Sequence, residues 1–136
     1  MGSVFFQAKA EAARKDNPLA DRWIVRPDVD AHVLVIPEEL PVGSYADMDR
    51  FTQVVLSNIR SGGNDVALVT QEPLSTRVPG RLIHVRGKVN GMQMEAFFGL
   101  FAQGRNIFQV MAFAPKGGFP KAKADLRRIV ESFEMP

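Results

Sequence analysis

The chain has no cysteine among its 136 residues. This absence excludes disulfide bonds, thiol nucleophiles and metal sites built from thiolates. No apolar run approaches the roughly 20 residues of a transmembrane helix, and the first residues lack the basic-then-apolar pattern of a signal peptide. There is also no phosphate-binding loop, dinucleotide fingerprint or serine nucleophile elbow. The sequence therefore carries no motif of the common enzyme classes, and we expect a protein that is not an enzyme.

Histidine is scarce, and His32 stands in the one arrangement that could hold a metal ion. Asp28, Asp30 and His32 occupy alternate positions, which point the same way in an extended chain. Two carboxylates and an imidazole are ligands for zinc or manganese. The competing interpretation is a Pro-Asp turn that leads into a strand, and it is favoured because a closed site needs more ligands. We predict no metal and no other cofactor.

The charge is unevenly distributed along the chain. Residues 1–80 carry 8 Lys or Arg and 11 Asp or Glu, a net charge of −3, whereas residues 81–136 carry 9 and 4, a net charge of +5. Solvated faces of a sheet and a helix account for most such asymmetries. Hydrophobic residues make up 46% and charged residues 24% of the chain, which is an ordinary globular composition. The length fits a single domain.

The second half of the chain predicts three strands and a closing helix. Alternating, β-branched residues at 81–89, 92–102 and 105–114 predict strands, and Asn90–Gly91 between the first two is a strong hairpin signal. Apolar residues at helical spacing predict a helix over 121–133. Both faces of the strand 92–102 are apolar, so we expect cover on both sides of the sheet. Met92, Met94, Phe97, Phe98 and Phe101 form either this core or a soft binding surface, and the core is favoured.

The first half predicts strands around one long helix. Apolar runs at 23–25, 32–36 and 65–71 indicate strands, and residues 44–61 indicate a helix. Ser44 and Asp47 resemble a capping box at its start. Its expected buried stripe consists of Tyr45, Met48, Phe51, Val55 and Ile59. Residues 1–22 are expected to be a helical extension that is partly derived from cloning, followed by one domain over 23–136.

A helix between strands, then three antiparallel strands and a final helix, favour a sheet with helices on its faces. The expected class is α+β, with an α/β/α sandwich around a mainly antiparallel sheet. This order of elements resembles the PsbP-like superfamily, which includes the bacterial DcrB-like proteins and the Ran-binding Mog protein. The resemblance covers roughly residues 23–135. It is carried by the Pro-Gly at 79–80, the hairpin 87–91, the segment 104–115 and the closing Glu-Ser-Phe at 131–133.

The resemblance implies a bacterial protein with a non-catalytic role. Members are mostly assembly subunits, exported lipoproteins and chaperone-like adaptors, and they share no catalytic residues. Many are exported behind a lipid-anchored cysteine. Because this chain has no cysteine, two locations stay open: the bacterial cytoplasm, or an exported location if an upstream signal segment was removed.

Three functional hypotheses follow. The first is a binding or assembly module of the PsbP-like type that engages a protein partner. The second is a chaperone or adaptor that shields apolar segments of a secreted or membrane protein. The third is a metal-binding protein that uses Asp28, Asp30 and His32. A homodimer is also left open.

The predicted partner-binding residues are His84, Arg86, Lys88 and Arg105. The first three alternate with apolar residues in one strand and so share a face, and Arg105 lies at a later turn. Preorganised cations suit an acidic protein more than nucleic acid, which generally needs a denser basic patch.

Overall fold

The computed structural model describes residues 21–62, 64–74 and 79–133, and it forms a six-stranded antiparallel sheet in the order β1-β2-β6-β5-β4-β3. The strands are Asp21–Arg26 (β1), Ala31–Glu39 (β2), Asn64–Leu74 (β3), Gly80–Val89 (β4), Met92–Gln103 (β5) and Asn106–Pro115 (β6). The helices are the 3-10 turn Pro27–Val29 (η1), Met48–Gly62 (α2) and Phe119–Glu131 (α3). Of the predicted extension over 1–22, residues 1–20 lie outside the described residues.

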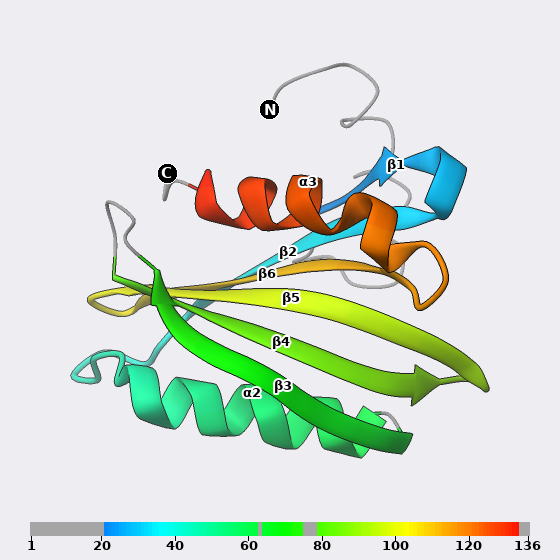
Figure 1. Cartoon of the computed structure of the whole chain (residues 1–136). Coiled ribbons are helices and arrows are strands. Elements are labelled where there is room, and N and C mark those ends of the chain that lie inside the picture. Colours follow the sequence, from blue (N-terminus) through cyan, green and yellow to red (C-terminus); the bar gives the residue numbers. More distant parts are fainter. Residues whose placement is uncertain (1–20, 63, 75–78, 134–136) are drawn as a thin grey trace.

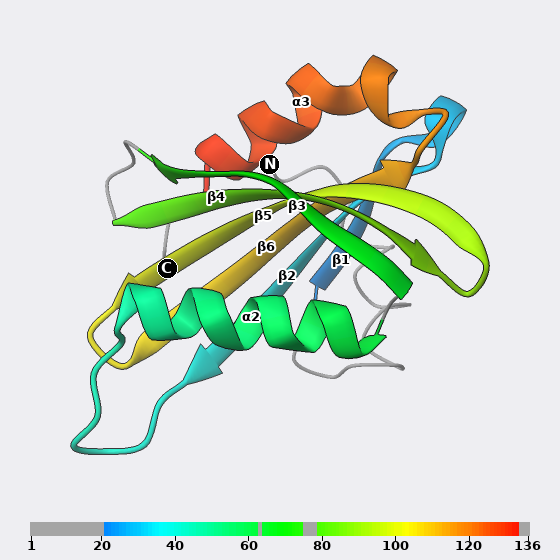
Figure 2. The same ribbon diagram turned by 60° about the horizontal axis from the view of Figure 1, so that its bottom comes forward.

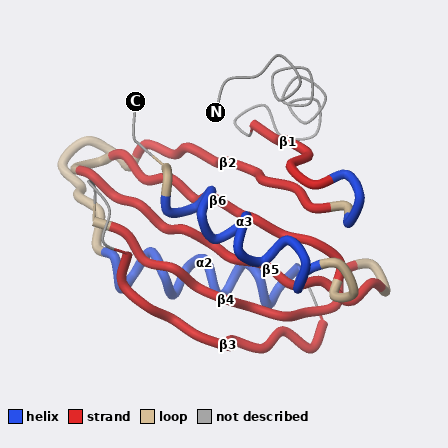
Figure 3. Tube along the Cα trace, turned by 45° about the horizontal axis from the view of Figure 1, so that its top comes forward, coloured by secondary structure: helices blue, strands red, loops and turns tan. Residues whose placement is uncertain are grey.

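The two long helices lie on opposite faces of the sheet (Figures 1 and 3). Helix α3 covers β6, β5 and β2, while α2 covers mainly β3, β4 and β5. The predicted α+β class and α/β/α sandwich are confirmed. None of the helices within the described ranges combines the length and the apolar character needed to cross a membrane.

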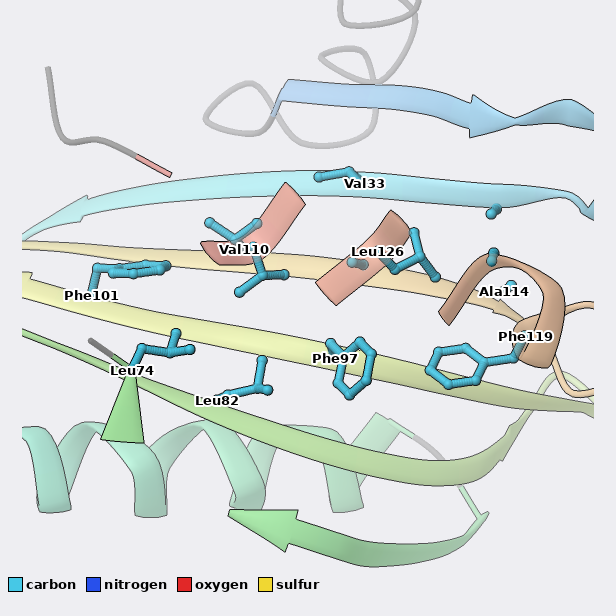
Figure 4. Close-up of a cluster of buried hydrophobic side chains, with 13 residues drawn as sticks. Val33, Leu74, Leu82, Phe97, Phe101, Val110, Ala114, Phe119 and Leu126 are labelled. Carbon is cyan, nitrogen blue, oxygen red and sulfur yellow. The ribbon is translucent and has the colours of Figure 1, made fainter. Parts of the chain in front are cut away.

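The larger core lies between α3 and the sheet (Figure 4). Phe97 and Phe101 of β5 point into it and meet Phe119, Leu126 and Val130 of α3. These side chains alternate along β5 with those of the other face, as the pleat requires. Burial of each large apolar side chain stabilises the fold by roughly 1.5–3 kcal/mol.

The smaller core lies between α2 and the sheet. Phe98 and Leu100 of β5 pack there with Val55 and Leu56 of α2 and with Ile83 of β4. Strand β5 therefore contributes to both cores, which confirms the expectation that both its faces are covered.

The β4–β5 hairpin forms as predicted. Asn90 and Gly91 have φ values of 50° and 80°, as a type I′ turn requires at its two central residues. This turn sets the register in which Val89 lies opposite Met92 and His84 lies opposite Phe97.

Helix α2 begins later than the sequence predicts. Met48 is its first residue, and the Asp47 carboxylate accepts hydrogen bonds from the backbone N–H groups of Asp49 and Arg50 at 3.0 and 3.3 Å. Asp47, and not Ser44, therefore supplies the capping oxygen. Tyr45 was expected in the buried stripe but lies in the preceding loop and is exposed, so that part of the prediction is wrong.

Candidate functional site

His84 lies in the core beneath α3. Its Nε2 is 2.6 Å from Oε2 of Glu95, and both side chains are buried. The ring stacks on Phe119 at 5.4 Å and meets Phe97 at 4.9 Å between centroids. Buried polar groups cost free energy unless they bond one another, so His84 and Glu95 stabilise each other there. In this conformation His84 presents no exposed charge.

Arg86 and Lys88 are the two predicted cations that lie near each other, at the β4–β5 hairpin. Arg86 lies directly opposite Glu95 on β5, and its Nε is 3.3 Å from Oε1 of that carboxylate. Glu95 thus contacts both His84 and Arg86. Lys88 is half-buried, and in the described part of the chain it makes no ion pair. The surface beside the hairpin is therefore weakly basic, with Glu95 offsetting part of the positive charge.

Arg105 lies at the other end of the sheet. Strand β5 separates the two turns, and its twelve residues span on the order of 35 Å at about 3.3 Å per residue. The Arg105 guanidinium pairs with the Glu39 carboxylate and donates a hydrogen bond to the Leu40 carbonyl at 3.1 Å. The structure therefore does not bring Arg105 together with Arg86 and Lys88.

Arg105 instead holds the loop that joins β2 to α2. The Leu40 N–H donates to the Arg105 carbonyl at 2.7 Å, and the Ala46 N–H donates to the Gly104 carbonyl at 2.9 Å. These bonds close the base of the loop, which projects beyond the sheet (Figure 2). Val42 and Tyr45 are 84% and 81% exposed in this loop.

The three candidate metal ligands, Asp28, Asp30 and His32, do not form one cluster. Asp28 lies in η1 and accepts hydrogen bonds from the Arg26 guanidinium at 3.0 and 2.8 Å, which hold the pKa of the Asp28 carboxyl below its usual range. Asp30 is left-handed, with φ 54°, and its Oδ1 lies 2.6 Å from Nε2 of His32. Across residues 21–62, 64–74 and 79–133, no group of three His, Cys, Asp or Glu side chains could hold a metal ion. The three side chains do not share a face because η1 interrupts the extended chain before β2, and this agrees with the favoured interpretation of a Pro-Asp turn that leads into a strand.

An apolar hollow lies on the α2 side of the sheet, beside the β4–β5 hairpin; we call it the hairpin hollow. Its volume is about 430 Å³. Three methionines and two phenylalanines line it: Met92, Met94, Met111, Phe98 and Phe113. Its rim exposes Met92 and Val89, and its polar lining residues are Arg86, Asn90 and Glu95. Of the proposed soft surface, Met92, Met94 and Phe98 belong to this hollow, whereas Phe97 and Phe101 are core residues beneath α3.

A second hollow, of about 710 Å³, lies at the other end of α2; we call it the loop hollow. Its walls come from the loop after β2, the first turns of α2 and the adjoining end of β6. Phe51, Val55 and Ile107 contribute apolar surface, while Arg50 and Asp47 contribute charge. This hollow is therefore more polar than the hairpin hollow.

The two hollows follow one another along α2. On β6 the loop hollow includes Gln109 and the hairpin hollow includes Met111, and on α2 they include Asn58 and Ile59. Adjacent residues of α2, and same-face neighbours of β6, thus belong to different hollows. We call this combined surface the α2 trough. Sequence reasoning did not locate it, because the trough depends on which strands lie beside α2 on one face of the sheet, and that is a long-range feature.

The comparisons with known proteins identify the fold. No protein-family model matches the chain, and no curated protein sequence matches it. The structure is similar to PA94 of Pseudomonas aeruginosa, a protein of unknown function, with a TM-score of 0.70 and 8% identity over 86% of this chain and 83% of that one.

Two further solved structures are similar. One is the PsbP protein of the cyanobacterium Synechocystis sp. PCC 6803 (CyanoP), with a TM-score of 0.58 and 13% identity over 87% of this chain and 82% of that one. The other is LpqN of Mycobacterium tuberculosis, involved in cell envelope biogenesis, with a TM-score of 0.59 and 9% identity over 80% and 64%. At these low identities the likeness shows that the chain shares its fold with the three proteins, one of which is a PsbP protein.

Proposed function

We propose that this protein belongs to the PsbP-like superfamily and is a non-catalytic binding module that engages a protein partner. The fold shared with CyanoP supports the superfamily. The observation that carries the function is the hairpin hollow, an open apolar surface next to exposed Met92 and Val89. Apolar concavities of this kind bind ligands or partner segments in other proteins.

The chemistry of the hairpin hollow indicates what it binds. Methionine is flexible and polarisable, so Met92, Met94 and Met111 can adapt to apolar side chains of different shapes. Arg86 lines the hollow and Lys88 does not. Both alternate with the apolar lining residues of β4 and share the face of His84, so an acidic group of a partner gains an attractive contact with them only where the partner reaches around the edge of the hairpin. Two cations, one of which pairs with Glu95, form too sparse a patch for duplex DNA, and we propose no role in nucleic-acid binding.

The second candidate function is that of a chaperone or adaptor that shields an apolar segment of a secreted or membrane protein. The apolar lining of the hairpin hollow favours it. Helix α2 covers mainly β3, β4 and β5. Strands β6 and β2 therefore lie beside α2 on the same face of the sheet. A helix of a partner protein could bind there, in the α2 trough. The third hypothesis, metal binding, is not favoured, because Asp28 bonds Arg26 and lies apart from the Asp30–His32 pair.

Binding of a defined peptide tests the proposal. The probe is a fluorescent synthetic helix rich in leucine and alanine with an acidic end, followed by anisotropy. We expect it to bind, and we expect Met92→Asp to weaken binding about tenfold, the effect of losing about 1.4 kcal/mol at an apolar contact. Ala124→Asp, at an exposed position of α3 on the other face, is the matched control and should leave binding unchanged.

Charge reversal separates the two candidate functions. If an acidic partner is recognised, Arg86→Glu with Lys88→Glu weakens binding of the acidic-ended peptide and reduces its dependence on salt. If apolar shielding alone operates, a peptide without the acidic end binds equally well and charge reversal has no effect. Failure of both peptides to bind, or equal binding by Met92→Asp and the wild type, would overturn the proposal.

A further inference from the structure

The two edges of the sheet differ in charge and length. Strand β1 at one edge has six residues, and three of them, Asp21, Arg22 and Arg26, are of charged type. Strand β3 at the other edge has eleven residues. Its six central residues, from Val66 to Gln71, include no charged side chain. Charged side chains are one device that protects a free edge from further pairing, and the centre of β3 lacks this device.

The centre of β3 also exposes large apolar side chains. Leu68 and Val69 are 40% and 38% exposed. A bulge between Leu68 and Thr70 leaves Val69 without a residue opposite it on β4. In the described sheet, β3 has a neighbouring strand on one side only. Its other side therefore offers backbone N–H and C=O groups to a further strand.

We propose that the free edge of β3 pairs with β3 of a second copy of this chain, in an antiparallel, two-fold arrangement. Such an interface is isologous, so each strand must be complementary to itself. The uncharged centre of β3 meets this condition, because in such a pair the central residues of one copy lie opposite central residues of the other copy, and none of them is charged. A net charge of +2 on the chain opposes the approach of two copies only weakly.

The charges at the two ends of β3 limit the register. Asp65 and Glu72 flank the uncharged centre, and like charges directly opposite each other destabilise a strand pair. Pairing centred on Val69 places each Val69 opposite its copy and keeps Asp65 from lying opposite Glu72. Glu72 is also paired with Arg127 of α3, which reduces its effect at the edge. This inference is independent of the proposed function, because the α2 trough does not include Leu68 or Val69.

The absence of native cysteine allows a direct test, since a single introduced cysteine is the only thiol in the chain. In a two-fold strand pair the residue nearest the axis lies about 4.5–5.5 Å from its copy between Cα atoms, a distance that a disulfide spans. We expect Val69→Cys to give a cross-linked dimer under mild oxidation, and Leu68→Cys to give much less, because in the register centred on Val69 residue 68 lies opposite residue 70 of the copy. Val54→Cys is the control, because Val54 is 50% exposed but lies on α2. Equal cross-linking of the control would overturn the proposal.

Sedimentation equilibrium of the wild-type chain provides the second test. The chain has a mass of 15.1 kDa, and we expect twice this mass at high protein concentration. Val69→Lys should shift the protein to the monomer, because lysine on an edge opposes strand pairing, whereas Val54→Lys should remain dimeric. Circular dichroism verifies that both variants fold, and if Val69→Lys does not fold, the cysteine comparison decides. A wild type that stays monomeric at every concentration, or a Val69→Lys dimer as stable as the wild type, would overturn the proposal. If the β3 edge instead binds an extended segment of another protein, the wild type stays monomeric, and this result also overturns the proposed dimer.

Discussion

At the scale of single residues, helix α3 covers both His84 and Gly99: Phe119 stacks on the His84 ring, and Val130 lies against Gly99. The strand pattern places His84 on the same face as Arg86 and Lys88, and this alternation is correct. Which part of that face is buried depends on Phe119, whose ring covers His84. Gly99 on β5 lies beneath the same helix and allows it to approach the sheet closely.

Replacement of Gly99 by alanine is predicted to destabilise the fold. A Cβ atom at this position would lie 2.4 Å from Cγ1 of Val130 and 2.8 Å from Cε2 of Phe101. Overpacking of this kind costs about 1–3 kcal/mol. Chemical denaturation measures the change in the free energy of unfolding. Gly117→Ala is the control, because nothing lies within 4 Å of a Cβ there; an equal effect of the two substitutions would contradict the prediction.

At the scale of the elements, loops and turns decide where helices and strands begin. The Ser44 N–H donates to the Pro41 carbonyl at 3.0 Å, and Gly43 has a φ of 89°. The periodicity predicts a helix that begins at Ser44. This turn, together with the hydrogen bonds between Arg105 and the base of the loop, holds residues 41–46 in a conformation that is not helical. Helix α2 therefore begins only where Asp47 caps it.

Replacement of Gly91 by valine is predicted to weaken the β4–β5 hairpin. Its φ of 80° is strained for a β-branched residue, at a cost of about 1–3 kcal/mol. No atom lies within 4 Å of a Cβ at this position, so the backbone conformation alone accounts for the loss. Thermal unfolding measures it. Met92→Val introduces the same side chain one residue later, in a strand, and should cost less; an unchanged melting temperature for Gly91→Val would contradict the turn assignment.

At the scale of the whole molecule, the sheet couples the two cores. Phe97 and Phe98 are neighbours on β5, but one is buried under α3 and the other under α2. Loss of either helix would leave apolar side chains of the same strand in water. We therefore expect the two cores to unfold together.

A matched pair of substitutions tests this cooperation. Leu126 of α3 and Leu56 of α2 are both buried, in different cores. Each leucine-to-alanine change is expected to lower the free energy of unfolding by about 2–5 kcal/mol. In both variants the transitions followed by far-ultraviolet and near-ultraviolet circular dichroism should still coincide. Two separate transitions in either variant would show that the cores unfold independently.

The order of strands and helices, the Asn90–Gly91 turn and the burial of both faces of β5 could all be predicted from the sequence. These features depend on local preference and on periodicity within one segment, which a sequence displays directly. It did not determine that His84 pairs with Glu95 in the core, that Arg105 holds the loop after β2, or that η1 separates Asp28 from Asp30 and His32. Nor did it reveal the α2 trough or the free edge of β3. Each of these depends on which distant segments become neighbours, and the periodicity of a single segment carries no information about that.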